Sequence, residues 1–152
     1  MEKIFALASQ FRKAIESATE DYCFESDISF RYFPRGCCGD ATDLLIHFLL
    51  QQNIKSYYIC GTYYGNNDGF GQSHAWAQLS NRMIVDITGD QFKNKSVFLN
   101  YSTPVYIGRG DDFHKLFKVE ERDVRKGVTL ENLGNDCYAR LRWLYDTILA
   151  HM

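Results

Sequence analysis

The sequence lacks an apolar run long enough to cross a membrane. The longest one, residues 44–50, is interrupted by His47 and is far shorter than the roughly 20 residues that a membrane-spanning helix needs. The first residues, MEKIFALASQFRKAIE, mix acidic and basic side chains and show no apolar stretch followed by the small-residue cleavage site of a signal peptide. We therefore expect a mature cytoplasmic protein without a membrane partner.

The sequence also lacks an excess of charge of either sign. Lys and Arg number 17, Asp and Glu number 19, and the formal net charge is -2 with a pI near 6.1. Basic nucleic-acid-binding proteins obtain most of their nonspecific affinity by attraction to phosphates. We expect no nucleic-acid partner.

The cysteines form neither a disulfide framework nor a zinc-binding pattern. Their number, 5, is odd, whereas small secreted scaffolds carry even, regularly spaced sets. No C-x-x-C pair occurs, although a zinc site needs three or four ligands at compatible spacing. We expect reduced thiols, no metal and no other cofactor. We interpret His47 as a polar group of a helix, His114 as a surface residue, and three cysteines as packing residues: Cys23, Cys60 and Cys137.

The composition that is present suits a folded domain. With 45% hydrophobic and 15% aromatic residues, the chain has ample core material, and 152 residues fit one domain over positions 1–152. Apolar residues at helical spacing predict an N-terminal helix over residues 4–18, a buried central helix after Cys38, and a C-terminal helix from Leu130 to Ile148.

The β-rich segments lie between the central and C-terminal helices. Residues 56–64 read as a strand, and residues 73–79 and 83–87 predict a hairpin around Ser80 and Asn81. A further strand is expected at 105–107. The order predicts an α+β domain in which a central helix packs on a mostly antiparallel sheet.

Three side chains in these elements could form a catalytic unit. A thiol at a helix start is favoured as thiolate by unpaired N–H groups and the helix dipole, and both Cys37 and Cys38 are placed there. His74, on the first hairpin strand, could take the thiol proton. Asp86, on the second strand, could lie beside His74 and orient it. Asp90 competes with Asp86 for this role; we prefer Cys38 and Asp86.

The same residues resemble a known family. Gly36-Cys37-Cys38-Gly39-Asp40 opening a helix, His74-Ala75-Trp76 as H-x-W, and Val85-Asp86-Ile87-Thr88 as V-D-x-T are similar to the transglutaminase-like core. The resemblance spans residues 34–88. Two departures, at Gln78 where an acid is common and at Ile87 where proline is common, leave the triad intact.

The resemblance implies a papain-like fold and a Cys38-His74-Asp86 triad that acts through a covalent thioester on Cys38. Family members act as transglutaminases, amidases, peptidases or acyltransferases, so the expected partner is a peptide, a protein or a small acyl substrate. Water as acceptor gives hydrolysis, and an amine gives acyl transfer; both stay open.

The surroundings of the triad supply further candidates. Gln72 or Gln91 could stabilise the oxyanion beside the Cys38 backbone N–H, and Trp76 could wall the cleft or fill the core. The Gly-rich loop at residues 65–71 could gate the substrate. The alternative from another class is a noncatalytic binding module that retains the papain-like fold and uses the tyrosines of residues 56–64 as a contact surface.

Overall fold

The computed structural model describes residues 1–65, 71–134 and 136–152. Within these residues, one antiparallel sheet of five strands accompanies three α-helices. The helices are α1 (Glu2–Glu20), α2 (Cys38–Gln51) and α3 (Tyr138–Leu149). The strands are β1 (Ser56–Tyr63), β2 (Gln72–Leu79), β3 (Ile84–Asp86), β4 (Tyr106–Gly108) and β5 (Val124–Lys126). The expected α+β class is confirmed.

The sheet places β2 at its centre. Its strand order is β4-β3-β2-β1-β5, and β2 pairs with β1 along its whole length, with Gly61 opposite His74. On its other side β2 pairs with β3, with Ala77 opposite Val85. The expected hairpin is therefore present, with a second strand shorter than residues 83–87. Because side chains alternate along a strand, His74 and Trp76 point to one face of the sheet.

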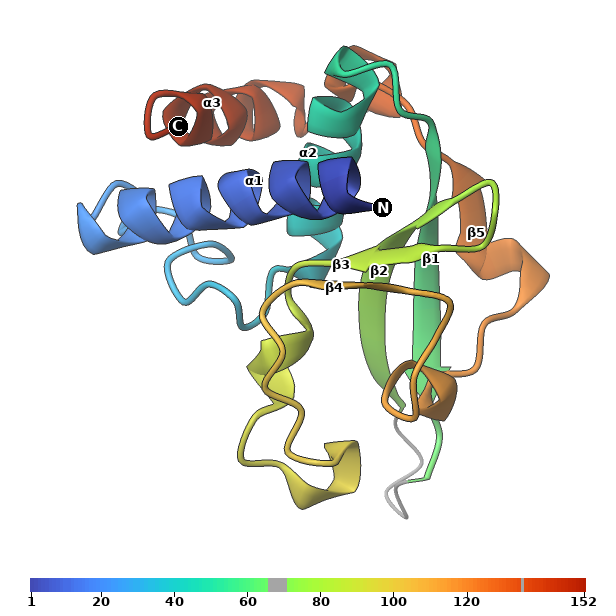
Figure 1. Cartoon of the computed structure of the whole chain (residues 1–152). Helices are drawn as coiled ribbons and strands as arrows, with labels where there is room; N and C mark the ends of the chain where they lie inside the picture. The colour runs from blue at the N-terminus through green and yellow to red at the C-terminus, as the bar shows by residue number, and fades with distance from the viewer. Residues whose placement is uncertain (66–70, 135) are drawn as a thin grey trace.

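The helices cover one face of the sheet. Ala77 and Val85 belong to a buried cluster with apolar residues of α1, α2 and α3. Within it, Phe11 of α1 stacks on Phe48 of α2 with ring centroids 5.0 Å apart. Figure 1 shows α1 and α3 running alongside one another, with α2 between them and the strands. The predicted central helix is thus buried on nearly all sides.

The opposite face of the sheet is covered by an aromatic cluster. Trp76 packs there against side chains from the segments that follow β3 and β4, and the buried members are Ile59, Trp76, Ile84, Phe92, Phe98, Phe113 and Phe117. These segments contain short 3-10 helices, among them Gly89–Phe92 and His114–Leu116, drawn in yellow to orange in Figure 1. The sheet therefore separates a mixed core, shared with the helices, from a mainly aromatic one.

The C-terminal helix differs from the prediction. Residues Leu130–Leu133 form a separate 3-10 helix, and Gly134 adopts φ +67. This left-handed conformation suits glycine and ends helices, so α3 begins only at Tyr138. The buried positions Leu141, Leu144 and Ile148 keep the helical spacing that the sequence indicated.

Two strands also differ from expectation. β4 begins at Tyr106, one residue later than the predicted 105–107 segment. β5 was not predicted, because its three residues are all exposed and show no apolar alternation; it joins the sheet by pairing with β1. No helix in the described residues has the length and apolar character needed to traverse a bilayer.

Candidate active site

Cys38 lies at the N-terminus of the buried helix. Gly36 has φ +77, a conformation that glycine tolerates, and the chain then enters α2 with Cys37 as its N-cap. The Cys37 carbonyl accepts the first helical hydrogen bond, from the Ala41 N–H at 2.8 Å. Cys38 is thus placed where unpaired N–H groups and the helix dipole favour an anion.

The two adjacent cysteines occupy different environments. Cys37 is only 2% exposed and belongs to the mixed core, and burial raises the pKa of its thiol far above the ordinary value. Cys38 is partly exposed. The geometry favours Cys38, since only it combines access with an anion-stabilising position.

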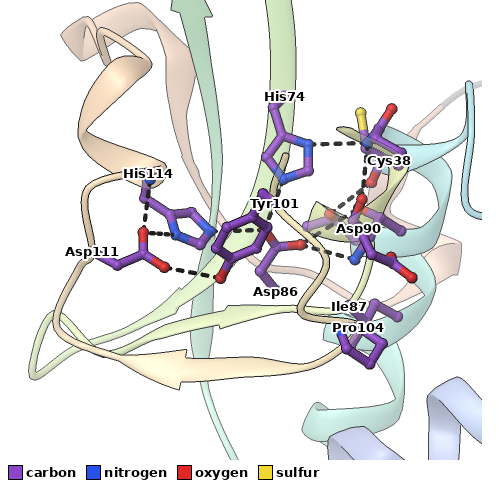
Figure 2. Close-up of polar contacts among 12 residues, drawn as sticks. Cys38, His74, Asp86, Ile87, Asp90, Tyr101, Pro104, Asp111 and His114 are labelled. Atoms are coloured by element: carbon purple, nitrogen blue, oxygen red, sulfur yellow. Dashed lines mark hydrogen bonds and ion pairs between the residues drawn. The ribbon is translucent and has the colours of Figure 1, made fainter. Parts of the chain in front are cut away.

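His74 connects Cys38 to Asp86. Its Nε2 lies 2.7 Å from Asp86 Oδ2, and both side chains are almost fully buried. The imidazole also interacts with the Cys38 thiol, which lowers the pKa of Cys38 and raises the pKa of His74. Figure 2 shows the His74 ring between Cys38 and Asp86. The structure therefore brings together the three residues that the sequence proposed.

The charges of these groups support one another. Burial would raise the pKa of Cys38, but the hydrogen bond and charge of His74, together with the Ala75 backbone N–H, outweigh it and lower the pKa below the ordinary value. Burial likewise opposes the charged form of His74, yet the Asp86 carboxylate and Cys38 raise the His74 pKa to about 9. A thiolate-imidazolium pair is the arrangement these shifts favour.

Asp90, the alternative to Asp86, is engaged elsewhere. Its two carboxylate oxygens accept hydrogen bonds from Arg12 Nη1 and Nη2, each at 2.8 Å. Arg12 Nη1 also donates to the Ile87 carbonyl at 2.7 Å and to the Pro104 carbonyl at 3.2 Å, and Figure 2 shows Asp90, Ile87 and Pro104 beside the site. Asp90 therefore anchors the segment after β3. Of the two aspartates, only Asp86 contacts His74.

His114 was wrongly interpreted as a surface residue. It is 4% exposed, and its Nε2 lies 2.8 Å from the same Asp86 oxygen that His74 contacts. Its Nδ1 lies 2.6 Å from Asp111 Oδ1, and Tyr101 donates to Asp111 Oδ2 at 2.9 Å. Each ring nitrogen of His114 therefore faces a carboxylate oxygen, one of Asp111 and one of Asp86.

A local pattern could have identified this fourth member. Asp111 also contacts the backbone at the start of the short helix that carries His114, because its Oδ1 accepts the His114 backbone N–H at 2.8 Å. The aromatic residues Phe113 and Phe117 flank the histidine and are buried. A D-x-x-H pattern between aromatic residues therefore indicates a buried, paired histidine.

The two candidate oxyanion donors lie in different environments. Gln91 Nε2 is 3.2 Å from His74 Nδ1 and donates to the Thr88 carbonyl at 3.1 Å. Gln72 Nε2 donates to the carbonyl of Ser73 at 3.1 Å on an exposed part of β2. Since His74 Nε2 is hydrogen-bonded to Asp86, Nδ1 is the ring nitrogen available to the thiol. Of the two glutamines, only Gln91 lies beside Nδ1.

Trp76 lies in the core of the site rather than on its surface. It is 3% exposed, and its ring centroid lies 5.7 Å from that of His74 and 5.2 Å from that of His114. Of the two roles considered from the sequence, the core role fits this burial. Within the aromatic cluster Trp76 packs against the two imidazoles.

The other cysteines and His47 have structural environments. His47 Nδ1 accepts the Leu130 backbone N–H at 3.1 Å inside the core. Cys23 and Cys60 are partly buried, whereas Cys137 is exposed, so the packing role expected for Cys137 is wrong; it lies at the N-cap of α3 rather than within a continuous helix. The gating loop expected at residues 65–71 lies largely outside the described residues.

One group in the site has the composition of a metal-binding set. Single ligand atoms of His74, Asp86 and His114 lie within 4.8 Å of one another, and two imidazoles with a carboxylate can bind several divalent metals. Here, however, the two Nε2 atoms hydrogen-bond to one Asp86 oxygen, and a cation would have to displace both protons. The hydrogen-bonded state accounts for this geometry.

Comparison with known proteins finds no relative of this chain. The chain matches no protein-family model, no curated protein and no solved structure. The function must therefore be argued from the site.

Proposed function

We propose that this protein is a thiol-dependent hydrolase or acyltransferase with a papain-like, transglutaminase-like core. In this proposal Cys38 is the nucleophile, His74 the base and Asp86 the residue that orients the base. The substrate is an amide, a peptide or another acyl compound, and the reaction proceeds through a thioester on Cys38.

One observation carries the proposal: Cys38, at the start of a buried helix, interacts with His74, whose Nε2 lies 2.7 Å from Asp86 Oδ2. The elements that carry these residues also follow the order of the family core. A helix supplies the cysteine, the first strand of an antiparallel hairpin supplies the histidine, and the second strand supplies the aspartate.

The first half of the reaction forms the thioester. The Cys38 thiolate attacks the carbonyl carbon, an S–C bond forms, and the carbonyl electron pair moves to oxygen. When the tetrahedral intermediate collapses, the bond to the leaving group breaks, and the His74 imidazolium gives that group its proton. Asp86 holds His74 in the orientation that both steps need.

The second half releases the acyl group. Water or an amine attacks the thioester carbonyl, His74 accepts the proton of the attacking group, and the C–S bond breaks to restore the Cys38 thiolate. Water as the acceptor makes the protein a peptidase or amidase, and an amine makes it a transglutaminase or acyltransferase.

The oxyanion formed in both halves requires donors. The Cys38 backbone N–H, at the helix N-terminus, is the first in this proposal, and the Gln91 side-chain amide is the second. Gln91 suits the role because its Nε2 lies beside His74 Nδ1, on the side of the imidazole that faces the thiol. Hydrogen-bond donors that are held in place before the reaction stabilise the oxyanion far more than water molecules do.

A noncatalytic binding module is the alternative. Two tyrosines near its proposed surface are well exposed, Tyr57 at 42% and Tyr64 at 58%. Such a module has no need for a thiol with a lowered pKa beside a buried His-Asp pair. The alternative predicts slow alkylation at every accessible thiol, whereas the enzyme proposal predicts fast and selective alkylation at Cys38.

Intact-mass trapping of the thioester tests the enzyme proposal. The protein is mixed with activated esters, glutamine-containing peptides and acyl thioesters, quenched in acid and weighed, and the adduct is located by peptide mapping. We expect one acyl group on Cys38. Cys38→Ser should abolish this thioester, and Cys37→Ser is the matched control that should retain it. An adduct on Cys37 instead would overturn the assignment.

A further inference from the structure

A groove with a volume of about 610 Å³ includes Gln91, which contacts His74, in its lining. Residues 32–35, in the loop that leads into α2, form part of it together with Arg12 of α1. The segment that follows β3 contributes Asp90, Gln91, Lys93, Asn94 and Lys95. The groove therefore approaches the Cys38-His74 pair through Gln91.

Gln91 connects the groove directly to the reacting groups. It lines the groove, and its Nε2 lies 3.2 Å from His74 Nδ1. Arg35, on the opposite side, belongs to the same short loop as Gly36 and Cys37. A substrate whose carbonyl carbon lies at Cys38 can therefore extend along this groove.

The groove carries an unbalanced positive charge. Its one carboxylate, Asp90, is paired by two hydrogen bonds to Arg12. Three more cations line it, and all are exposed: Arg35, Lys93 and Lys95. Among the described residues, no carboxylate lies within 4.0 Å of any of these three. Three positive charges are left for a ligand.

This local charge is opposite in sign to that of the whole chain, whose formal net charge is -2. General basicity therefore does not explain it. Arginine and lysine together form strong charge-assisted hydrogen bonds with carboxylates. Beside them, Tyr32, Phe33 and Pro34 offer apolar surface, which suits the side chains of a peptide better than a free ion.

We propose that this groove binds a carboxylate-bearing segment of the substrate, so that the acyl substrate is an acidic peptide. The inference rests on the proposed function, because it places the reacting carbonyl at Cys38. Arg35, Lys93 and Lys95 act as specificity residues that contact the acidic segment, while Cys38 and His74 carry out the chemistry.

Alkylation of Cys38 by matched peptide probes tests the proposal. The C-terminal amides iodoacetyl-Gly-Glu-NH2 and iodoacetyl-Gly-Gln-NH2 differ by one side-chain carboxylate, and iodoacetyl-phosphoethanolamine carries a phosphate. The rate at Cys38 is measured by mass spectrometry for each probe and compared with that of iodoacetamide. We expect the Glu probe to react about threefold or more faster than the Gln probe at low salt, and the difference to shrink at 1 M salt, as expected for attraction by nearby exposed cations.

Charge-matched variants test which cations cause the preference for the Glu probe. Lys93→Gln with Lys95→Gln should remove most of the preference for the Glu probe, and adding Arg35→Gln should remove the rest. Lys3→Gln with Lys13→Gln, on α1, changes the net charge equally and should keep the preference. All five side chains are exposed, so each variant should keep its melting temperature.

The outcomes separate this inference from the proposed function. An equal Glu-to-Gln rate ratio in the wild type, or a ratio that the groove variants do not change, overturns the acidic-peptide assignment. A gain for the phosphate probe without one for the Glu probe also overturns it. The iodoacetamide rate alone reports whether Cys38 is activated, so slow labelling by iodoacetamide counts against the enzyme proposal while the ratio still tests the groove.

Discussion

His74 and His114 bind the same oxygen atom of Asp86, with Nε2 to Oδ2 distances of 2.7 Å and 2.8 Å. The other oxygen, Oδ1, accepts the Thr88 backbone N–H at 2.9 Å. Burial disfavours the charged carboxylate, but the two imidazoles outweigh it and lower the Asp86 pKa far below the usual range. Asp86 is therefore an ionised carboxylate in a nearly dry site, which orients both rings.

Replacing Asp86 with asparagine should disable the site. Asp86→Asn keeps the shape but removes the charge that holds His74 as an imidazolium. We expect the rate of thioester formation to fall by about 10²- to 10⁴-fold, the range seen when such orienting groups are changed in hydrolases. Stopped-flow measurement with an activated ester gives this rate.

Asp90→Asn is the matched control, because it changes a nearby aspartate that contacts Arg12 instead of His74. It should lower the melting temperature, since it weakens a largely buried ion pair, and should leave the acylation rate within a few-fold of the wild type. A greater loss of activity from Asp90→Asn than from Asp86→Asn would reverse the two assignments.

The sequence could identify the His74-Asp86 pair because both residues belong to one hairpin. A two-strand register with a short turn brings residues near one another without any knowledge of the rest of the fold. Cys38 could be identified from the sequence for a similar reason, since a helix start is a local feature. His114 and Arg12 reach the site from distant parts of the chain, and no local periodicity shows that the segment after β4 folds back over the sheet.

The pH dependence of Cys38 reactivity should follow from two opposite pKa shifts, a lowered pKa of Cys38 and a raised pKa of His74. Because its pKa is lowered, alkylation should rise at a lower pH than for an ordinary thiol, whose pKa is about 8.5. His74 keeps its proton until its raised pKa of about 9. The thiolate-imidazolium pair therefore dominates between the Cys38 pKa and about 9.

Two pH profiles check this window. The rate of iodoacetamide alkylation should rise once and stay high, since it needs only the thiolate. Acylation by an amide substrate should rise and then fall above pH 9, because the leaving group needs the His74 proton. In His74→Ala, the thiol loses the main contribution that opposes burial, so the alkylation curve should move to higher pH. An unmoved curve would show that His74 does not activate Cys38.

Gln91 should matter for acylation but not for alkylation. An alkyl halide reacts without forming an oxyanion, whereas an ester or amide does form one. Gln91→Ala should therefore slow thioester formation about 10²-fold or more, while the iodoacetamide rate stays within a few-fold of the wild type. Paired kinetics with both reagents provide the measurement.

Gln72→Ala serves as the comparison, since the Gln72 side chain hydrogen-bonds only to the neighbouring Ser73 carbonyl among the described contacts. It should change neither rate by more than a few-fold. If Gln72→Ala slowed acylation and Gln91→Ala did not, the second oxyanion donor would lie on β2 instead of the segment after β3.

His114 should tune the charge that Asp86 presents to His74. Its ring lies between Asp86 and Asp111 and shares with His74 the same Asp86 oxygen. His114→Gln removes the hydrogen bond of His114 to that oxygen, so Asp86 should stabilise the His74 imidazolium more strongly. A more strongly held imidazolium lowers the Cys38 pKa further, and the alkylation curve should move to lower pH.

The same change should weaken the fold. His114→Gln leaves two carboxylates with fewer donors at a buried position, and breaking a buried ion pair typically costs about 3–5 kcal/mol. Urea unfolding measures that loss, and Lys115→Gln is the control because it removes an exposed positive charge from the same short helix. A stability loss with an unmoved alkylation curve would make His114 a structural residue only. A shift to lower pH, absent in Lys115→Gln, would establish that it acts on Cys38 through Asp86 and His74.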